Sequence, residues 1–148
     1  MSDQVKNNIF YVCSLIEYLG RKTKNRRADI VSFLGKKEIE RQLELAEVNH
    51  CLPLEQVSEG LTEELCIPEG GFDSVGKSLY PVPGIFAIAK DYQRLIIDVK
   101  KPEENIADII YDVFQSFISD EISDFNSAVF YSSPEYLKLS YEEGKLLL

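Results

Sequence analysis

The sequence predicts an all-α protein, an irregular bundle of six or seven helices with one Pro/Gly-rich loop near the middle. Apolar residues recur at steps of three and four along most of the chain. Alternation of period two, which is typical of strands, is plausible only at residues 127–131, and these can equally continue a helix. Four Gly and three Pro gather in residues 66–84, which therefore form a loop. No repeat of fixed period is present, so a solenoid is not expected.

Three helices are expected in the first third of the chain. The first spans Val5 to Leu19 and stops at Gly20. The second is capped by Asn25 and ends before Gly35, a residue suited to the left-handed conformation. The third runs from Lys36 to about Asn49. The apolar residues that define these helices are Val5, Ile9, Val12, Ile16 and Leu19, then Ala28, Ile30, Val31 and Leu34, then Ile39, Leu43 and Ala46.

Two more helices flank the loop. Pro53 suits the first turn of a helix that carries Leu54, Val57, Leu61 and Leu65 at helical spacing. After the loop, a broad apolar face extends from Ile85 to Val99, and Pro102 closes that element.

The last part of the chain predicts two further helices. The stretch from Glu103 to about Phe125 has the strongest helical period, with Glu103 and Glu104 favouring its N-terminus, and it is expected to be the central core helix. A Ser-Pro-Glu sequence at residues 133–135 opens a final helix that ends near Gly144.

Length and composition fit a single domain, residues 1–148, with a helical half over about 1–66, the loop over 66–84 and a half with longer helices over 85–148. Three Cys are too few for a disulfide scaffold, and the start of the chain lacks a signal-peptide pattern. No apolar run reaches the length of about 18 residues that a membrane span requires. A soluble, cytoplasmic protein is therefore expected, with no membrane partner and no cofactor.

The formal net charge of −9 is unevenly distributed. Residues 1–50 hold nine Lys or Arg against seven Asp or Glu, a net +2, whereas residues 51–148 hold seven against eighteen, a net −11. An acidic surface repels nucleic acid and attracts basic proteins. Such an excess of acid can also serve solubility alone. Any nucleic-acid site would therefore lie in the first third.

Five cations between the first two expected helices favour one alternative, DNA binding through a helix-turn-helix at about residues 25–49. The second helix of that unit would enter the major groove, and the cations before it would contact phosphate. Four Glu residues on the reading helix oppose this hypothesis, and a charged turn is usually solvated surface. The candidate DNA-binding residues are Arg21, Lys22, Lys24, Arg26, Arg27, Lys36, Lys37 and Arg41.

All the thiols and the only imidazole, from Cys13, His50, Cys51 and Cys66, could in principle complete a zinc site. There is no Cys-x-x-Cys pair, and the side chains of the adjacent residues His50 and Cys51 are expected to diverge at a helix end. Ordinary packing of free cysteines is therefore favoured over a metal site or a nucleophile.

Carboxylates in the stretch 108–124 share helix faces at steps of four, but a solvated face explains them better than acid–base catalysis. The string GFDSVGKS, residues 71–78, has the spacing of a phosphate-binding loop, but it lacks the preceding strand and following helix that such a loop requires. No catalytic residue, cofactor site or metal site is predicted.

Aromatic residues mixed with Ser and Glu near the C-terminus suit a protein-binding surface, because aromatic rings supply contact area at little entropic cost. The alternative is a terminal helix packed on the core. The candidate protein-binding residues are Phe130, Tyr131, Tyr136 and Tyr141.

The strings IEYLGRKTKNRRADIV, FDSVGKSLYPVP and SPEYLKLSYEEGKLL resemble an uncharacterised family of small acidic helical bacterial proteins, over most of the chain. The resemblance to this family implies no activity and assigns no role to any residue. The resemblance implies a gene neighbourhood of the antitoxin or mobile-element type, and it favours protein binding over catalysis. We therefore expect a non-enzymatic, protein-binding or regulatory protein whose acidic C-terminal surface meets a basic partner or a second copy of the chain.

Overall fold

The computed structural model describes residues 1–148 and contains seven α-helices, one 3₁₀ helix and no strand. The predicted all-α class is confirmed. The helices are α1 (Asp3–Thr23), α2 (Arg27–Asn49), α3 (Leu54–Glu64), α4 (Ile85–Val99), α5 (Ile106–Gln115), α6 (Phe117–Ser123), the 3₁₀ helix η1 (Val129–Tyr131) and α7 (Pro134–Glu143). None of them combines the length and the apolarity that a membrane crossing requires.

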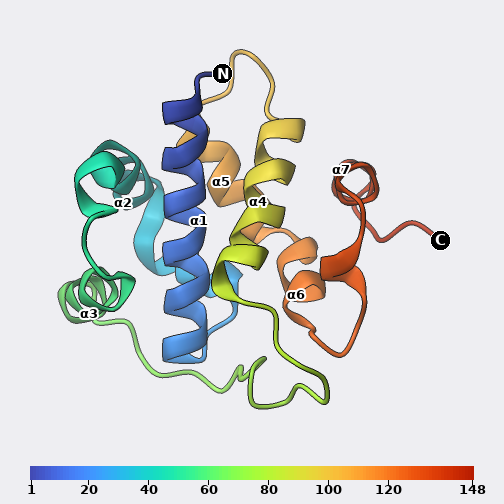
Figure 1. The fold of residues 1–148 in the computed structure, drawn as a ribbon, viewed down its shortest axis with the longest axis horizontal. Helices are drawn as coiled ribbons and strands as arrows, with labels where there is room; N and C mark the ends of the chain where they lie inside the picture. Colours follow the sequence, from blue (N-terminus) through green and yellow to red (C-terminus); the bar gives the residue numbers. More distant parts are fainter.

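Helix α1 occupies the centre of the bundle (Figure 1). It packs against α4 on one side and against α2 and α3 on the other. Every residue from Tyr11 to Glu17 is buried. The central place was predicted for residues 103–125, and this prediction is wrong, because that segment forms two shorter helices, the first of which packs mainly on α2.

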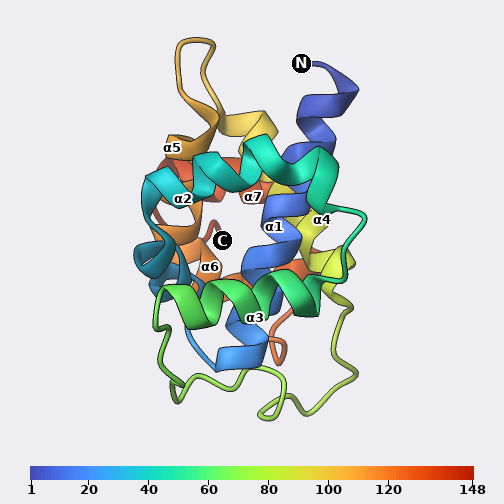
Figure 2. The same ribbon diagram turned by 90° about the vertical axis from the view of Figure 1, so that its left-hand side faces the viewer.

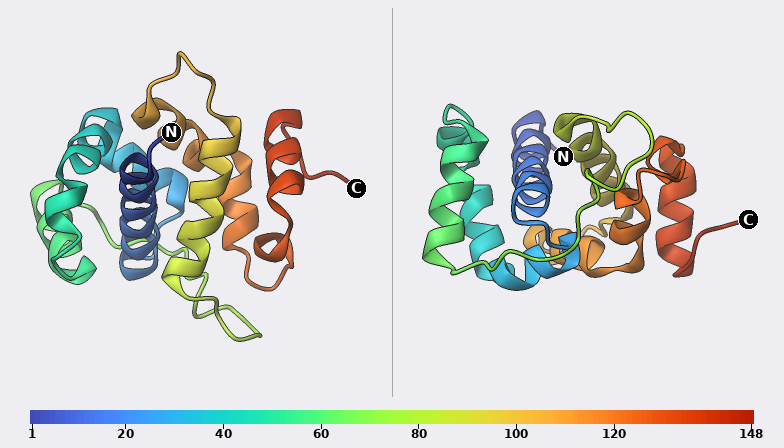
Figure 3. Two further views of the ribbon diagram at one scale, coloured as in Figure 1. Left: turned by 45° about the horizontal axis from the view of Figure 1, so that its top comes forward. Right: turned by 90° about the horizontal axis from the view of Figure 1, so that it is seen from below.

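The remaining elements surround α1 and α4. Helices α2 and α3 both lie in front of α1, one above the other, when the bundle is seen from their side (Figure 2), and α7 lies beside α4 at the opposite edge (Figure 1). Residues 66–84, the long loop, run across one end of the bundle from α3 to α4 (Figure 3). The buried apolar side chains form one cluster with members from all seven helices.

Several predicted boundaries are confirmed. Helices α3 and α4 span the predicted ranges to within a residue or two. Helix α7 begins as expected, because the Ser133 hydroxyl accepts a hydrogen bond from the Tyr136 amide at 3.2 Å, and it ends at Gly144 with φ of 84°. Gly35 also interrupts the helix as predicted, with φ of 74° and ψ of 162°. The helix resumes directly, so α2 has a kink at Gly35 and no loop.

Two residues near the end of α1, Gly20 and Asn25, do not have the roles predicted for them as a helix stop and a helix cap. Gly20 does not stop α1, which continues to Thr23 and ends where Lys24 adopts the left-handed conformation. A Cβ atom on Gly20 would lie only 2.4 Å from Cδ of Arg27, so the glycine allows that side chain to cross α1. Asn25 does not cap α2, because its side-chain amide donates hydrogen bonds to neighbouring oxygens and Arg26 holds the cap position.

The predicted continuous helix over residues 103–125 is wrong because Ser116 has an extended backbone, with φ of −73° and ψ of 168°. Its hydroxyl accepts from the Ile118 amide at 3.3 Å and donates to the Val113 carbonyl at 2.7 Å. Serine favours such local bonds over a helix interior. Asn105, and not the two glutamates before it, caps α5. Residues 129–131 form the 3₁₀ helix, so neither the strand nor the continued helix is present.

Replacing Gly20 with alanine should lower the free energy of unfolding by about 1–3 kcal/mol, because the new Cβ would displace the Arg27 side chain. Gly60, inside α3, has open space around its missing Cβ. Gly60→Ala is therefore the matched control and should raise stability by about 0.5–1 kcal/mol through helix propensity alone. Urea unfolding measures both variants. A stabilising Gly20→Ala would contradict the crossing of Arg27 over α1.

Candidate protein-binding surface

A buried ion pair between Glu17 of α1 and Arg27 of α2 underlies the candidate surface. Both side chains are fully buried. The Glu17 carboxylate accepts hydrogen bonds from Nε and Nη2 of Arg27, both at 2.9 Å, and from Nε of Arg21 at 2.7 Å. Burial opposes the charge of Arg27, but the adjacent Glu17 carboxylate outweighs this and holds the pKa of Arg27 above its ordinary value. The pair fixes the start of α2 against α1.

The same two arginines hold the long loop. Arg27 donates from Nη2 to the Ser74 hydroxyl at 3.3 Å, and its guanidinium carbon lies 6.0 Å from the centre of the Phe72 ring. Arg21 donates from Nη2 to the Pro83 carbonyl at 2.9 Å. The loop is therefore bonded near its middle and at its end to cations that Glu17 positions.

A second set of contacts fixes the beginning of the loop. Asn25 donates from Nδ2 to the Pro68 carbonyl at 2.8 Å, and the Gly70 amide donates to the Thr23 carbonyl at 2.8 Å. Gly70 is required here, because a Cβ would lie 2.4 Å from both the Asn25 Oδ1 atom and the Lys24 carbonyl oxygen. The backbone of the loop thus lies directly against the turn between α1 and α2.

Asn126 joins the loop to the segment after α6. Its Oδ1 accepts from the Leu79 amide at 2.7 Å, and its Nδ2 donates to the Lys77 carbonyl at 3.0 Å. Figure 1 shows the two segments adjoining at one end of the bundle. Because one side chain satisfies both a donor and an acceptor of the loop backbone, the loop cannot shift without breaking both bonds.

Large apolar side chains are exposed on these two joined segments. Leu79 is 82% exposed, Tyr80 63% and Tyr131 81%. Loops longer than about 12–15 residues without secondary structure are uncommon and are often functional. We call these exposed side chains, together with Val75, the loop face.

The other three aromatic residues predicted to bind protein are only partly accessible. Phe130 is half-buried against the core. Tyr136 is half-buried and donates its hydroxyl proton to the Leu147 carbonyl at 2.7 Å. Burial, together with nearby carboxylates, raises the pKa of Tyr141. Of this group, Tyr131 alone is exposed and contributes to the loop face.

Three of the five cations proposed to contact phosphate are arginines with close carboxylate partners inside the protein. Arg21 and Arg27 are bonded to Glu17, and Arg27 is wholly inaccessible. Arg26 makes a two-pronged contact with Asp120 of α6, with Nη2 at 2.7 Å from the carboxylate. These three residues join α2 to α1 and to α6.

The other five candidate DNA-binding residues lie on the surface. Those with a carboxylate neighbour are Lys24 with Glu69 at 3.9 Å, Lys36 with Asp108 at 3.7 Å and Arg41 with Glu38 at 3.0 Å. Lys22 and Lys37 are exposed without an ion pair. A helix-turn-helix joins its helices by a turn of three or four residues, whereas here the two halves of α2 meet at the single kinked residue Gly35.

The cysteines and the histidine do not form a cluster with three metal ligands. Cys13 is buried in α1, and burial raises the pKa of its thiol, whereas Cys51 and Cys66 are exposed. The Cys51 sulfur lies 3.8 Å from Nε2 of His50.

The segment GFDSVGKS lies in the long loop with no strand before it and no helix directly after it. A hollow of about 170 Å³ separates it from α6. The charged residues that line this hollow are Asp73, Asp120, Asp124 and Lys77. Three carboxylates disfavour a phosphate group, and the Gly76 amide already donates to Asp73 Oδ1 at 2.8 Å.

Comparison of the chain with protein-family models, with curated proteins and with solved structures gives no match.

Glu17, Asn126 and Leu79 were not predicted from the sequence as functional residues. One signal for Glu17 was available, because Glu17 lies one helical turn after Cys13 and one turn before Arg21, on the same face of α1. A carboxylate on such a face needs a cation. No comparable pattern marks Asn126, whose partners are backbone atoms of a distant loop.

The carboxyl with a raised pKa is Asp91 of α4, outside the acidic stretch considered for acid–base catalysis. Burial raises its pKa from 3.8 to about 6. The folded protein therefore holds this proton more tightly than the unfolded chain, and stability falls as pH rises from about 4 to about 6.

Asp91→Asn should remove the loss of stability that the buried, ionised Asp91 carboxylate causes above about pH 6. The variant should be more stable than the wild type at pH 7, by about 1 kcal/mol after allowance for the solvent that reaches the carboxyl, and equally stable near pH 4. Urea unfolding at the two pH values tests this. A stability difference that is the same at both pH values would contradict the raised pKa.

Proposed function

We propose that the protein is a non-enzymatic binding protein whose loop face docks a basic protein partner. The observation that carries the proposal is the anchoring of an irregular loop to the segment after α6, with Leu79 and Tyr80 of the loop and Tyr131 of that segment exposed to solvent. Ordering a flexible surface costs binding energy, and a surface that is fixed in advance avoids that cost. Exposed aromatic and aliphatic side chains on a fixed backbone are typical of binding hot spots.

The charge of the segment that carries Tyr131 supports a basic partner. Residues 102–137 contain eight Asp or Glu and no Lys, Arg or His. Only Asp108 and Asp120 among them take part in an ion pair. Unpaired carboxylates steer a basic protein toward this part of the molecule and fix its orientation. Two copies of the same acidic surface would repel each other, so self-association through it is disfavoured.

DNA binding through residues 25–49 receives less support. The candidate cations without an ion pair are Lys22, one of the proposed phosphate contacts, and Lys37 on the proposed reading helix. A regulatory role of the antitoxin or mobile-element type remains part of the proposal, and it rests on the family resemblance alone.

The proposal is tested by replacing Leu79 and Tyr131 together with serine. Both side chains are exposed, so the change in stability should stay within about 0.5 kcal/mol for each, while the contact area of the loop face is lost. Val48 at the end of α2 is 69% exposed and lies outside the loop face, so Val48→Ser is the matched control.

The immobilised proteins are incubated with lysate of the source organism at about 50 mM and about 500 mM salt, and retained proteins are quantified by mass spectrometry. A basic protein should be retained by the wild type and Val48→Ser at low salt, weakened at high salt and lost from the double variant. If the basic protein is retained equally by the double variant and the wild type, and equally at low and high salt, the proposal is overturned. Retention of duplex DNA in place of protein would favour the DNA-binding alternative.

A further inference from the structure

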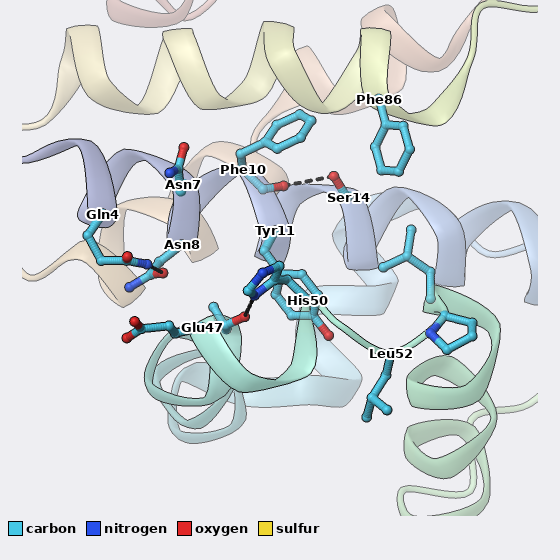
Figure 4. Close-up of a pocket in the computed structure, with 13 residues that line it drawn as sticks. Gln4, Asn7, Asn8, Phe10, Tyr11, Ser14, Glu47, His50, Leu52 and Phe86 are labelled. Carbon is cyan, nitrogen blue, oxygen red and sulfur yellow. Dashed lines mark hydrogen bonds between the residues drawn. The ribbon is translucent and has the colours of Figure 1, made fainter.

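A groove with a volume of about 560 Å³ lies between the N-terminal half of α1, the end of α2 and the start of α3. Figure 4 shows the side chains around it. Its size lies within the range of about 300–1,000 Å³ that is typical of small-molecule sites. The residues that line it are Gln4, Asn7, Asn8, Phe10, Tyr11, Ser14, Ala46, Glu47, His50, Leu52, Pro53, Leu54 and Phe86.

Tyr11 provides the first sign that the groove is a site. Its side chain reaches from α1 toward His50 (Figure 4), and the residue is only 8% exposed. The hydroxyl is buried and has no hydrogen-bond partner in the protein. A buried hydroxyl without a partner is destabilising, and native structures rarely keep one without a reason. The hydroxyl is closed to solvent as the groove stands, so a ligand would satisfy it by displacing the side chains that cover it and offering an acceptor.

Other polar groups in the groove have unused hydrogen-bonding capacity. Gln4 donates from Nε2 to Asn8 Oδ1 at 2.8 Å, which leaves the Gln4 carbonyl oxygen and the Asn8 amide nitrogen free for a ligand. His50 has Nδ1 at 3.3 Å from the Ala46 carbonyl and Nε2 at 3.8 Å from the Cys51 sulfur, so a ligand at Nε2 would displace only the weak contact with sulfur.

An aromatic wall closes one side of the groove. The rings of Phe10 and Phe86 lie 5.8 Å apart, and Phe86 remains 60% exposed. The face of a flat ring packs favourably against such side chains. Leu52 to Leu54 supply further apolar surface.

The charge of the lining restricts the ligand. Glu47 is the only carboxylate, and no Lys or Arg lines the groove. The whole chain carries a formal charge of −9. Phosphorylated or carboxylated ligands would therefore bind without a countercharge and against repulsion.

We propose that this groove binds a flat aromatic small molecule that is uncharged or positively charged and carries a hydrogen-bond acceptor or donor, such as an aromatic amide, with Tyr11 as the buried hydrogen-bonding residue. The site is separate from the loop face and does not depend on the proposed partner.

The test uses benzamide, benzamidine and benzoate, which share a ring and differ in charge. Each is titrated into ¹⁵N-labelled protein to about 10 mM, and backbone and side-chain amide shifts are followed. Benzamide should shift the amides of Gln4, Asn8 and His50, benzamidine should bind at least as well, and benzoate should bind at least about tenfold more weakly.

Tyr11→Phe separates a binding role from a structural one. Since the hydroxyl has no partner in the protein, the variant should be at least as stable as the wild type, yet it should bind benzamide about three- to tenfold more weakly. Tyr18→Phe, the same change on α1 outside the groove, should bind normally. Phe86→Ser, at an exposed position, should also weaken binding without unfolding the protein.

Three results would overturn the proposal. These are no amide shifts at the groove with any probe, equal affinity for benzoate and benzamide, or unchanged benzamide affinity in both Tyr11→Phe and Phe86→Ser. A loss of stability in Tyr11→Phe would show that the hydroxyl has a structural partner and would also contradict it.

Discussion

The Glu17 carboxylate, fully buried on the central helix, is the constraint on which the rest of the structure depends. A buried charge is costly unless it is paired and its hydrogen-bonding capacity is used. Glu17 meets this requirement with Arg27 and Arg21, through three hydrogen bonds of 2.7–2.9 Å. Because Arg27 is the first residue of α2, satisfying Glu17 also determines where α2 starts and how it lies against α1.

The arginines bonded to Glu17 also hold the long loop at the surface. Arg27 and Arg21 each also donate to the long loop, at Ser74 and Pro83, so a polar cluster in the core fixes a segment that has no secondary structure of its own. Asn126 completes the attachment from the other side. A mobile loop loses entropy when a partner orders it, whereas this loop is already ordered by folding. The groove beside Tyr11 lies across α1, where α2 ends and α3 begins, so the two proposed sites are physically independent.

Local sequence patterns predicted much of the fold. Apolar periodicity located the helices, and local capping signals placed the start of α7 after Ser133, its end at Gly144 and the interruption of α2 at Gly35 correctly. Errors arose where a distant contact overrides a local preference. Gly20 looks like a helix stop but makes room for Arg27, and Asn25 looks like a cap but holds the long loop. The break at Ser116 lies within an unbroken apolar period, so periodicity alone could not reveal it.

The candidate sites were harder to predict, for a related reason. Arginines between two helices look the same in a sequence whether they face solvent or a buried carboxylate, so Arg21 and Arg27 were interpreted as surface cations. Tyr131 was predicted as a binding residue, but its neighbours in the loop face come from a segment much earlier in the chain, which no local pattern connects to it.

Hydrogen exchange of the loop amides in Glu17→Gln, compared with the wild type, tests the central role of the ion pair most directly. The glutamine side chain would keep the size of the glutamate but leave Arg27 without its countercharge. The account predicts that the amides of Gly70, Phe72 and Leu79, which are bonded in the native loop, lose protection before those of α4 and α5. Loop amides that stay as protected as in the wild type, or that exchange only together with the core, would contradict it.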